Sequence, residues 1–385
     1  MTSEWRTIRA ADFIDFNPRL SLKKGDIATK VAMDKLKPFT KKIPETEKAE
    51  FNGGAKFCNG DTVMARITPC LENGKTAYVD MLDDGEIGFG STEFIVMRAK
   101  TGISDPQFVY YTAINPVFRN VAIKSMVGSS GRQRVQQSVL EELELSVPDL
   151  EEQRRIGAFL ARIDEKIALN DRINDNLQQQ ASILYGKYFP YAVTDDLPAG
   201  WRVGTVGEIV EIHDSKRIPL SGAQRAKMEK RIYPYYGAAS LMDYVDEYIF
   251  DGKYLLLGED GTVVDDAGYP ILQYVWGQFW VNNHAHILTG KLGFNVESLL
   301  LLFKRTPVKS IVTGAVQPKI SQANLRSIQV AVPPQHELDA FNELIRPLFD
   351  QIRQNQDQNK ALTSLRDSLL PQLMSGEIDV SDIQL

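Results

Sequence analysis

Two short segments of the chain carry several basic side chains and no acidic ones. Residues 117–140 contain four basic residues and residues 303–328 contain five, and neither segment contains Asp or Glu. Glycine and serine at 128–131, and Gly314 in the second segment, predict loops whose basic side chains and backbone N–H groups bind phosphate. The residues that we expect to position the phosphates of a polyanion are Lys124, Arg132, Gln133 and Arg134 in the first segment and Lys309, Gln317 and Lys319 in the second. Ordinary solvated charge is the alternative interpretation.

A second set of side chains is a weaker prediction, for contacts with bases. Arginine can donate two hydrogen bonds to guanine, and the threonine methyl can meet a thymine methyl. The set is Arg66, Lys75, Ser91, Thr92, Lys216, Arg217, Tyr235 and Tyr236. For the two tyrosines, a place in the core is an equally good interpretation.

The chain contains near matches to catalytic motifs, and each departs from its motif at a residue the chemistry needs. Residues 69–76 (PCLENGKT) differ from the phosphate-binding loop because proline replaces its first glycine. Residues 115–118 (NPVF) and 17–20 (NPRL) lack the second proline of the amino-methyltransferase motif. Asp149 and Asp164 have the letters of a metal-dependent nuclease, but about 22 Å of one predicted helix separates them, so we interpret Asp149 as a helix cap.

Metal binding and thiol chemistry are equally weak predictions. His284 and His286 alternate on a predicted strand without an evident third ligand, which favours packing over a metal site. Cys58 and Cys70 form no CxxC pair and have no evident base nearby, which fits a reducing compartment. The sequence therefore predicts no catalytic residue, no metal and no cofactor held by this chain.

The basic segments belong to an internal repeat. An offset of 185 places residues 118–184 over 303–369 without a gap, and 14 of these 67 pairs are identical. Three basic positions match: Arg119 with Lys304, Lys124 with Lys309, and Arg134 with Lys319. Trp-Arg pairs at 5–6 and 201–202 begin the two copies, and the stretches between them diverge almost completely.

The second half of each copy predicts a long helix with a coiled-coil seam. Apolar residues alternate at spacings of four and three over about four heptads, which predicts helices of about 35 residues and about 50 Å. The seam positions are Ile156, Leu160, Ile163, Ile167, Asn170, Asn174, Leu177, Ala181 and Leu184 in the first copy, and Phe341, Ile345, Leu348, Ile352, Asn355, Asn359, Leu362, Arg366 and Leu369 in the second. We expect Pro347 and Pro371 to weaken the second helix.

Four asparagines near the middle of the seams set the helix register. A buried amide costs stability unless it finds a polar partner, so Asn170 and Asn174 should face Asn355 and Asn359. Antiparallel helices bring the two pairs level, and we favour that direction. Seams that pack against other proteins, with hydrated asparagines, are the alternative.

Length and composition define the protein class. With 385 residues, 43% hydrophobic and 24% charged, the chain is long enough for two or three globular domains. A net charge of −6 argues against attraction of nucleic acid over the whole surface, and no 18-residue apolar run or signal sequence is present, so we expect a soluble cytoplasmic protein.

The expected fold is α+β: two mixed α/β domains joined by two long antiparallel coiled-coil helices, with a pseudo-twofold internal repeat. Short apolar runs at 62–67, 93–97, 254–257 and 286–288 predict strands. The predicted boundaries are 1–147 for the first domain, 148–190 for the central helix, 191–332 for the second domain, 333–377 for the C-terminal helix and 378–385 for a tail.

Nearly the whole chain resembles the specificity (S) subunits of type I restriction-modification enzymes. The stretches that carry the resemblance are residues 66–76 (RITPCLENGKT), 128–134, 148–160 (PDLEEQRRIGAFL), 233–238 (YPYYGA), 248–252 (YIFDG), 281–288 (VNNHAHIL) and 369–376 (LLPQLMSG). The second helix departs from the family pattern, because residues 333–337 (PPQHE) lack the usual Glu-Gln pair.

The resemblance implies a non-catalytic subunit that reads double-stranded DNA, with each recognition domain binding half of a bipartite site. It implies that the helices space the half-sites and bind two methyltransferase (modification) subunits, and that restriction/translocase subunits join them. S-adenosylmethionine, ATP and Mg would then belong to the partner subunits, and no membrane is involved. A protein-binding scaffold with incidental basic loops is the alternative function.

Overall fold

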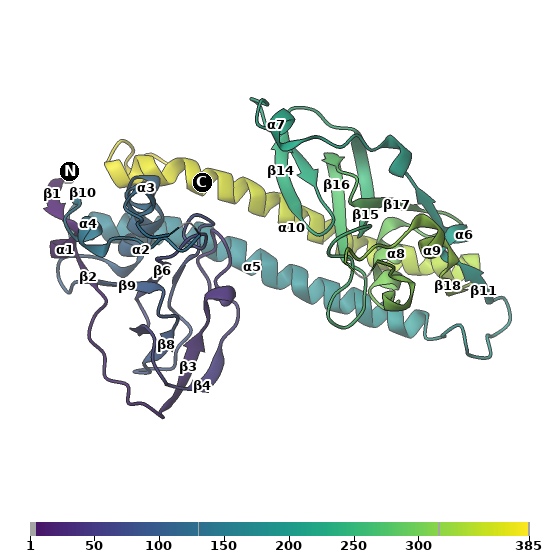
Figure 1. The fold of residues 1–385 in the computed structure, drawn as a ribbon, viewed down its shortest axis with the longest axis horizontal. Helices are drawn as coiled ribbons and strands as arrows, with labels where there is room; N and C mark the ends of the chain where they lie inside the picture. The colour runs from purple at the N-terminus through teal and green to yellow at the C-terminus, as the bar shows by residue number, and fades with distance from the viewer. Residues whose placement is uncertain (1–4, 130, 315, 384–385) are drawn as a thin grey trace. The chain divides into compact units, whose positions relative to one another are not determined.

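The computed structural model describes residues 5–129, 131–314 and 316–383 and divides the chain into two compact units (Figure 1). Unit 1 comprises Met1–Arg172 and Asn355–Leu385, and unit 2 comprises Ile173–Gln354. Two long helices, α5 (Leu150–Tyr188) and α10 (Gln335–Ser375), each contribute one half to each unit. Within the described residues, no helix combines the length and the apolar content that crossing a membrane requires.

Unit 1 contains a two-stranded and two four-stranded sheets, in the orders β1-β10, β2-β9-β6-β7 and β4-β3-β8-β5. The strands are β1 (Arg6–Arg9), β2 (Ile14–Phe16), β3 (Ile27–Val31), β4 (Glu47–Glu50), β5 (Lys56–Phe57), β6 (Thr62–Ala65), β7 (Thr76–Tyr78), β8 (Gly88–Gly90), β9 (Phe94–Ala99) and β10 (Glu144–Val147). The short helices are α1 (Ala10–Phe13), η1 (Met33–Lys35), α2 (Pro106–Ile114), α3 (Pro116–Lys124), α4 (Gln137–Glu141) and η4 (Val380–Asp382).

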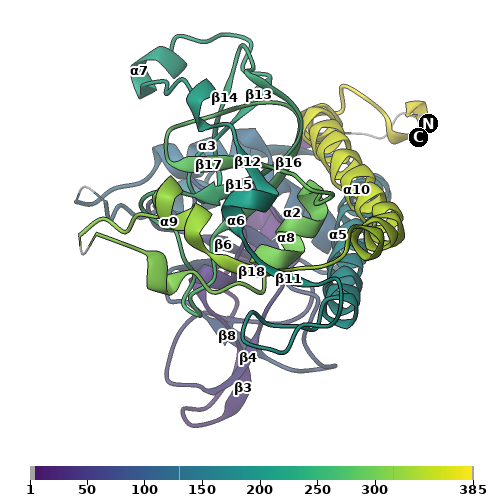
Figure 2. The ribbon, with the colours of Figure 1, turned by 90° about the vertical axis from the view of Figure 1, so that its right-hand side faces the viewer.

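Unit 2 contains the pair β11-β18 and one six-stranded sheet of order β12-β17-β15-β16-β13-β14 (Figure 2). Its strands are β11 (Arg202–Thr205), β12 (Val210–Ile212), β13 (Tyr233–Tyr236), β14 (Leu241–Val245), β15 (Phe250–Gly258), β16 (Leu272–Val281), β17 (Ala285–Gly290) and β18 (Gln329–Val332). Its short helices are α6 (Val206–Ile209), η2 (Asp214–Lys216), α7 (Gly222–Arg225), α8 (Val296–Phe303), η3 (Lys309–Ile311) and α9 (Gln322–Ser327). The apolar runs 254–257 and 286–288 lie in β15 and β17, and the runs 62–67 and 93–97 overlap β6, which ends at Ala65, and β9, which begins at Phe94.

Helices α5 and α10 pair antiparallel within each unit, as the seam predicted. In unit 1, Asp164 bonds Arg366 and Asn170 bonds Asn359. In unit 2, the Nδ2 of Asn174 donates to a carbonyl of α10, that of Ile352, at 3.4 Å. Residue numbers therefore rise along one helix as they fall along the other. Helix α10 continues through both of its prolines, since its buried apolar side holds the helix in place.

The seam asparagines find polar partners. Asn170 is fully buried, and its Nδ2 donates to the Oδ1 of Asn359 and to the Oε1 of Gln358, both at 2.8 Å. Asn359 in turn donates to Asp171 at 2.8 Å and to the carbonyl of Ile167 at 3.3 Å. A shift of one heptad would leave these amides against apolar side chains, so they favour this register.

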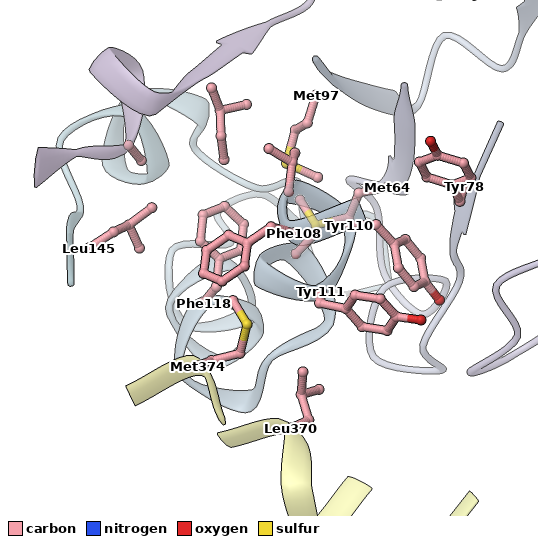
Figure 3. Close-up of a cluster of buried hydrophobic side chains, with 14 of the residues drawn as sticks. Met64, Tyr78, Met97, Phe108, Tyr110, Tyr111, Phe118, Leu145, Leu370 and Met374 are labelled. Atoms are coloured by element: carbon pink, nitrogen blue, oxygen red, sulfur yellow. The ribbon is translucent and has the colours of Figure 1, made fainter. Parts of the chain in front are cut away.

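The core of unit 1 joins the strands to both long helices. Figure 3 shows Phe108, Tyr110 and Tyr111 of α2 between Met64 and Met97 of the strands and Leu370 and Met374 of α10. Buried residues of α5, Ile156, Leu160 and Ile163 among them, belong to the same cluster. The first half of α5 and the second half of α10 are therefore part of the core rather than an appendage to it.

The repeat continues upstream of the residues whose sequences match. The N–H of Ala10 donates to the carbonyl of Leu143 in unit 1, and Val206 to Ile328 in unit 2, both at 2.8 Å. Strand β6 pairs β9 through Ala65 and Phe94, as β15 pairs β17 through Gly258 and Ala285. Both variable regions therefore contain the same elements in the same order. Each has a strand-helix-strand unit, a set of paired strands, a helix, and a last strand that pairs with the first.

A buried network of polar groups connects the strand-rich part of unit 1 to both long helices. Asp164 and Arg366 pair at 2.6 Å, and each side chain is 5% exposed. The hydroxyl of Tyr111 donates to the second oxygen of Asp164 at 2.5 Å. Lys41 then donates to Tyr111 at 3.2 Å and lies over the rings of Tyr78, Tyr110 and Tyr111. Burial lowers the pKa of Lys41 to about 8.

We predict that Arg366→Leu destabilises the protein by about 3–5 kcal/mol, because it leaves the buried carboxylate of Asp164 without its charged partner. The double variant Asp164→Leu/Arg366→Leu should be more stable than either single variant, since it buries no unpaired charge. Arg346→Leu, at an exposed position of α10, is the control. Urea denaturation measures all four, and a loss below about 1 kcal/mol in Arg366→Leu would contradict the interpretation.

The pKa of Lys41 predicts a pH dependence of stability. Its folded pKa of about 8 lies below the ordinary 10.5, so between these values the unfolded chain binds a proton that the folded chain has lost. The free energy of unfolding of the unmodified chain should therefore rise, relative to Lys41→Met, by on the order of 3 kcal/mol as pH increases through this window. Urea titrations of both proteins measure the difference, and a pH-independent difference would refute it.

Candidate nucleic-acid interface

The basic segment of unit 1 forms a hairpin loop. Val127 and Arg134 exchange backbone N–H···O bonds of 3.0 and 2.9 Å, and Arg134 also pairs with Ile67. Gly128 follows the first paired residue with φ of 140°, and a Cβ there would lie 2.9 Å from the carbonyl oxygen of Arg132. Glycine is therefore required at this turn. Ser130 of the predicted loop lies outside the described residues.

The side chain of Arg134 is held by a carboxylate that the sequence did not single out. Its Nη2 lies 2.6 Å from the Oε1 of Glu93, and its Nε donates to both oxygens at 3.0 Å. These hydrogen bonds lower the pKa of Glu93, and the charge of Arg66 contributes in the same direction. Arg134 is 44% exposed, so its guanidinium is oriented while its outer edge stays open to a ligand.

The other predicted phosphate contacts of unit 1 lie around this hairpin. Lys124 ends α3 and is exposed, as is Arg132, and neither has an ion-pair partner among the described residues. Gln133 is half-buried, and its carbonyl accepts the N–H of Thr68 at 3.0 Å. The two exposed cations therefore lie at the base and in the loop of one hairpin.

Unit 2 builds the corresponding hairpin with the same chemistry. Thr313 and Lys319 exchange backbone hydrogen bonds of 2.9 and 2.7 Å, and Gly314 follows with φ of 88°. Lys319 is 47% exposed and its Nζ lies 3.2 Å from Glu259. Lys309 and Gln317 are exposed at the two sides of the loop. Each hairpin thus presents several cations, and in each hairpin a glutamate orients one of them.

Matched backbone hydrogen bonds define equivalent positions in the two units. Arg66 donates to the carbonyl of Glu93 and accepts from Val135, both at 2.9 Å. Glu259 donates to the carbonyl of His284 and accepts from Ile320, both at 2.8 Å. Position 66 of unit 1 therefore corresponds to position 259 of unit 2, where a carboxylate replaces the guanidinium.

A buried ion network surrounds Glu259. Arg217 is 13% exposed and donates to Glu259 at 2.6 Å and to the carbonyl of Ala285 at 2.7 Å, and it lies 3.4 Å from Asp214. Asp214 accepts hydrogen bonds from His286 and Gln322, both at 2.6 Å. Burial acts to raise the pKa of Asp214, but His286, the backbone N–H of Ile287 and the charge of Arg217 lower it overall.

Asp214, Glu259 and His286 lie close enough together to hold a metal ion. Both ring nitrogens of His286 are already engaged, with Asp214 at 2.6 Å and the carbonyl of Ile320 at 2.8 Å. Arg217 and Lys319 supply the positive charge that an ion would bring to the carboxylates. We interpret the cluster as the support of the unit 2 hairpin.

The weaker candidates for base contact occupy varied environments. Thr92 and Lys216 are exposed, whereas Ser91 is half-buried and accepts the N–H of Glu93 at 3.1 Å. Lys75 donates to the carbonyl of Met33 at 2.9 Å. The segment containing Lys75 leads into strand β7 and not into a helix, unlike a phosphate-binding loop.

The two tyrosines lie against the sheet of unit 2. Tyr235 is 2% exposed, its hydroxyl is bonded to the backbone of Leu220, and the guanidinium of Arg225 covers its ring. Tyr235 is therefore a core residue in this structure, and we do not include it in the interface. Tyr236 is half-buried against Phe279, and burial raises its pKa to about 12.

Several other sequence interpretations concern structural residues. Asp149 caps α5 by accepting the N–H of Glu152 at 2.9 Å. Arg119 donates to the carbonyls of Leu71 and Glu72, and Lys304 donates to Gln178 of α5. This matched pair of basic residues therefore faces the protein and not a ligand.

The sequence model of one family matches most of the chain. Its description is type I restriction modification DNA specificity domain, and it matches residues 3–179 and 198–364. The chain belongs to this family. Each matched range contains one hairpin and the larger part of one long helix, so the family's domain corresponds to one copy of the internal repeat.

Individual relatives agree with this assignment. The MjaIX specificity subunit of Methanocaldococcus jannaschii is 24% identical over 68% of this chain and 66% of its own length. The EcoAI specificity subunit of Escherichia coli is 31% identical over 39% of this chain, and the match spans 26% of that protein. The crystal structure of the type I S subunit from M. genitalium shares the fold, with a TM-score of 0.54 and 18% identity over 96% of each chain.

Proposed function

We propose that this chain is the DNA-reading subunit of a type I restriction-modification complex, and that each unit reads one half of a bipartite site in double-stranded DNA. The observation that carries the proposal is the pair of hairpins, which present exposed cations at equivalent positions of a repeated scaffold. Lys124, Arg132 and Arg134 would contact phosphates in one half-site. Lys309, Gln317 and Lys319 would do so in the other.

Base reading would come from side chains near the hairpins. Thr92 and Lys216 are exposed and free to meet base edges, and Arg66, Ser91 and Tyr236 are partly accessible. Arg217 and Lys75 are engaged with Glu259 and Met33, so they would act by supporting their neighbours. The boundaries that we assign to the recognition domains are 1–147 and 191–332.

The helices would serve the rest of the complex. We assign residues 148–190 and 333–377 to spacing of the half-sites and to binding of two methyltransferase subunits, with restriction/translocase subunits joining that core. S-adenosylmethionine, ATP and Mg would be bound by those partners, and this chain would contribute recognition without catalysis. A complex that acts on chromosomal DNA would work in the cytoplasm.

Exchange of one recognition domain tests the proposal. Replacing residues 1–147 by the corresponding domain of a relative should change one half of the methylated motif and leave the other half unchanged, because each unit reads separately. Single-molecule methylation sequencing of cells that express the complex reads both halves at once. A motif changed in both halves, or in neither, would refute the proposal.

Removal of one hairpin cation should weaken binding to all DNA sequences alike. We predict that Arg132→Gln, and separately Lys309→Gln, each lower the slope of log affinity against log salt by about 0.9 in the complex with the methyltransferase, because one phosphate contact is lost. Arg6→Gln, at an exposed position of β1, is the matched control. A slope near zero in the unmodified complex would favour the protein-binding scaffold.

A further inference from the structure

Unit 1 contains a cavity beside its hairpin. The cavity has a volume of about 550 Å³, within the range of about 300–1,000 Å³ that small-molecule sites occupy. Residues 17–20, 54–56, 92, 94, 96 and Arg66 line it. Thr92 and Arg66 connect it directly to Glu93, the residue that orients Arg134.

The lining is cationic on one side and apolar on the other. Arg19, Lys56 and Arg66 contribute positive charge, and no lining residue is acidic. Pro18, Leu20 and Ala55 are partly exposed and form its apolar side. The Nζ of Lys56 donates to the carbonyl of Leu20 at 2.8 Å, which fixes one cation at the rim.

Arg66 has an unfilled hydrogen-bonding position. Its Nε is buried and has no partner among the described residues. A buried N–H without a partner costs free energy, but a ligand cannot reach it, so a ligand would meet the half-buried guanidinium of Arg66 through its other nitrogens. Phosphate oxygens are acceptors that match a guanidinium well.

In unit 2, side chains of the protein itself neutralise the charge at the position equivalent to Arg66. Glu259, the equivalent of Arg66, is bonded to Arg217 at 2.6 Å and to Lys319 at 3.2 Å. In unit 1 the equivalent of Lys319, Arg134, is bonded to Glu93 at 2.6 Å. Arg19, Lys56 and Arg66 line the cavity instead, and none of the three has an ion-pair partner among the described residues.

We propose that this cavity binds one nucleoside phosphate: its phosphate contacts Arg19, Lys56 and Arg66, and its sugar or base lies on the partly exposed apolar residues Pro18, Leu20 and Ala55. The nucleotide would be a unit of the bound DNA strand or a free mononucleotide, and both share this chemistry. The proposal rests on the proposed function only for the first of these two sources.

Binding of thymidine 5′-monophosphate to the full-length chain tests the site. Calorimetry should show binding of the monophosphate at least about tenfold tighter than binding of thymidine, because the cations hold the phosphate. Arg19 is exposed and has no ion-pair partner among the described residues. Arg19→Gln should therefore lower the affinity for the monophosphate about tenfold. Arg6→Gln, the same substitution outside the cavity, should bind like the unmodified chain.

A second arm identifies the source of the nucleotide. The complex with the methyltransferase is given duplexes in which one phosphate at a time is replaced by an uncharged methylphosphonate. If the cavity holds the DNA strand, one replacement weakens the unmodified complex about tenfold, does not further weaken Arg19→Gln, and the monophosphate competes with DNA. If Arg19→Gln alters monophosphate binding and leaves DNA binding unchanged, the ligand is a free nucleotide.

The proposal fails if Arg19→Gln and Arg66→Gln change neither monophosphate nor DNA binding. In that case, loss of DNA affinity in Arg132→Gln would still uphold the proposed function. If the complex does not bind DNA at all but Arg19→Gln weakens the monophosphate, the proposed function fails and the cavity remains a nucleotide site.

Discussion

The ion pair between Asp164 and Arg366 is the constraint on which unit 1 depends. Both groups are buried in a helix seam that is otherwise mainly apolar, so each needs the other, and α5 and α10 can satisfy them in one register. The repeat places Phe349 and Ala181 at the equivalent positions of unit 2, where both are buried in an apolar cluster. The polar pair therefore distinguishes the two copies of the seam. Through Tyr111 it also ties the position of α2, and with it the sheet, to the helices.

The hairpins show how an acidic protein can present cationic surfaces. Each hairpin combines exposed cations with one cation oriented by a glutamate, Arg134 by Glu93 and Lys319 by Glu259. An exposed salt bridge contributes little to stability, because solvent screens it. The salt bridge instead orients the long side chain in advance. Binding of a ligand then costs less conformational entropy. The net charge of −6 is distributed over the whole chain and leaves these local surfaces positive.

The sequence predicted the features that follow from spacing, and missed those that follow from backbone pairing. Heptad spacing predicted both long helices, their antiparallel direction and the contact of Asn170 with Asn359. The upstream repeat was not visible, because its residue offset changes from 196 at Ala10 and Val206 to 193 at Arg66 and Glu259 and 185 at Leu143 and Ile328. Backbone hydrogen bonds do not depend on side-chain identity, so the pattern persists where the letters diverge. Glu93 and Glu259 carry no sequence signal without that register.

A repeated scaffold with exchangeable side chains allows the two units to differ in surface chemistry while they keep one backbone pattern. The backbone at positions 66 and 259 makes the same hydrogen bonds, so the side chain there changes without disturbing the strands. Arginine at this position lines a cavity with Arg19 and Lys56 in unit 1, whereas glutamate in unit 2 pairs with Arg217 and Lys319. One substitution at a fixed backbone position therefore changes the local charge without changing the backbone. Divergence between the two variable regions needs no change of fold, because the pairs β6-β9 and β15-β17 hold equivalent positions in the two units.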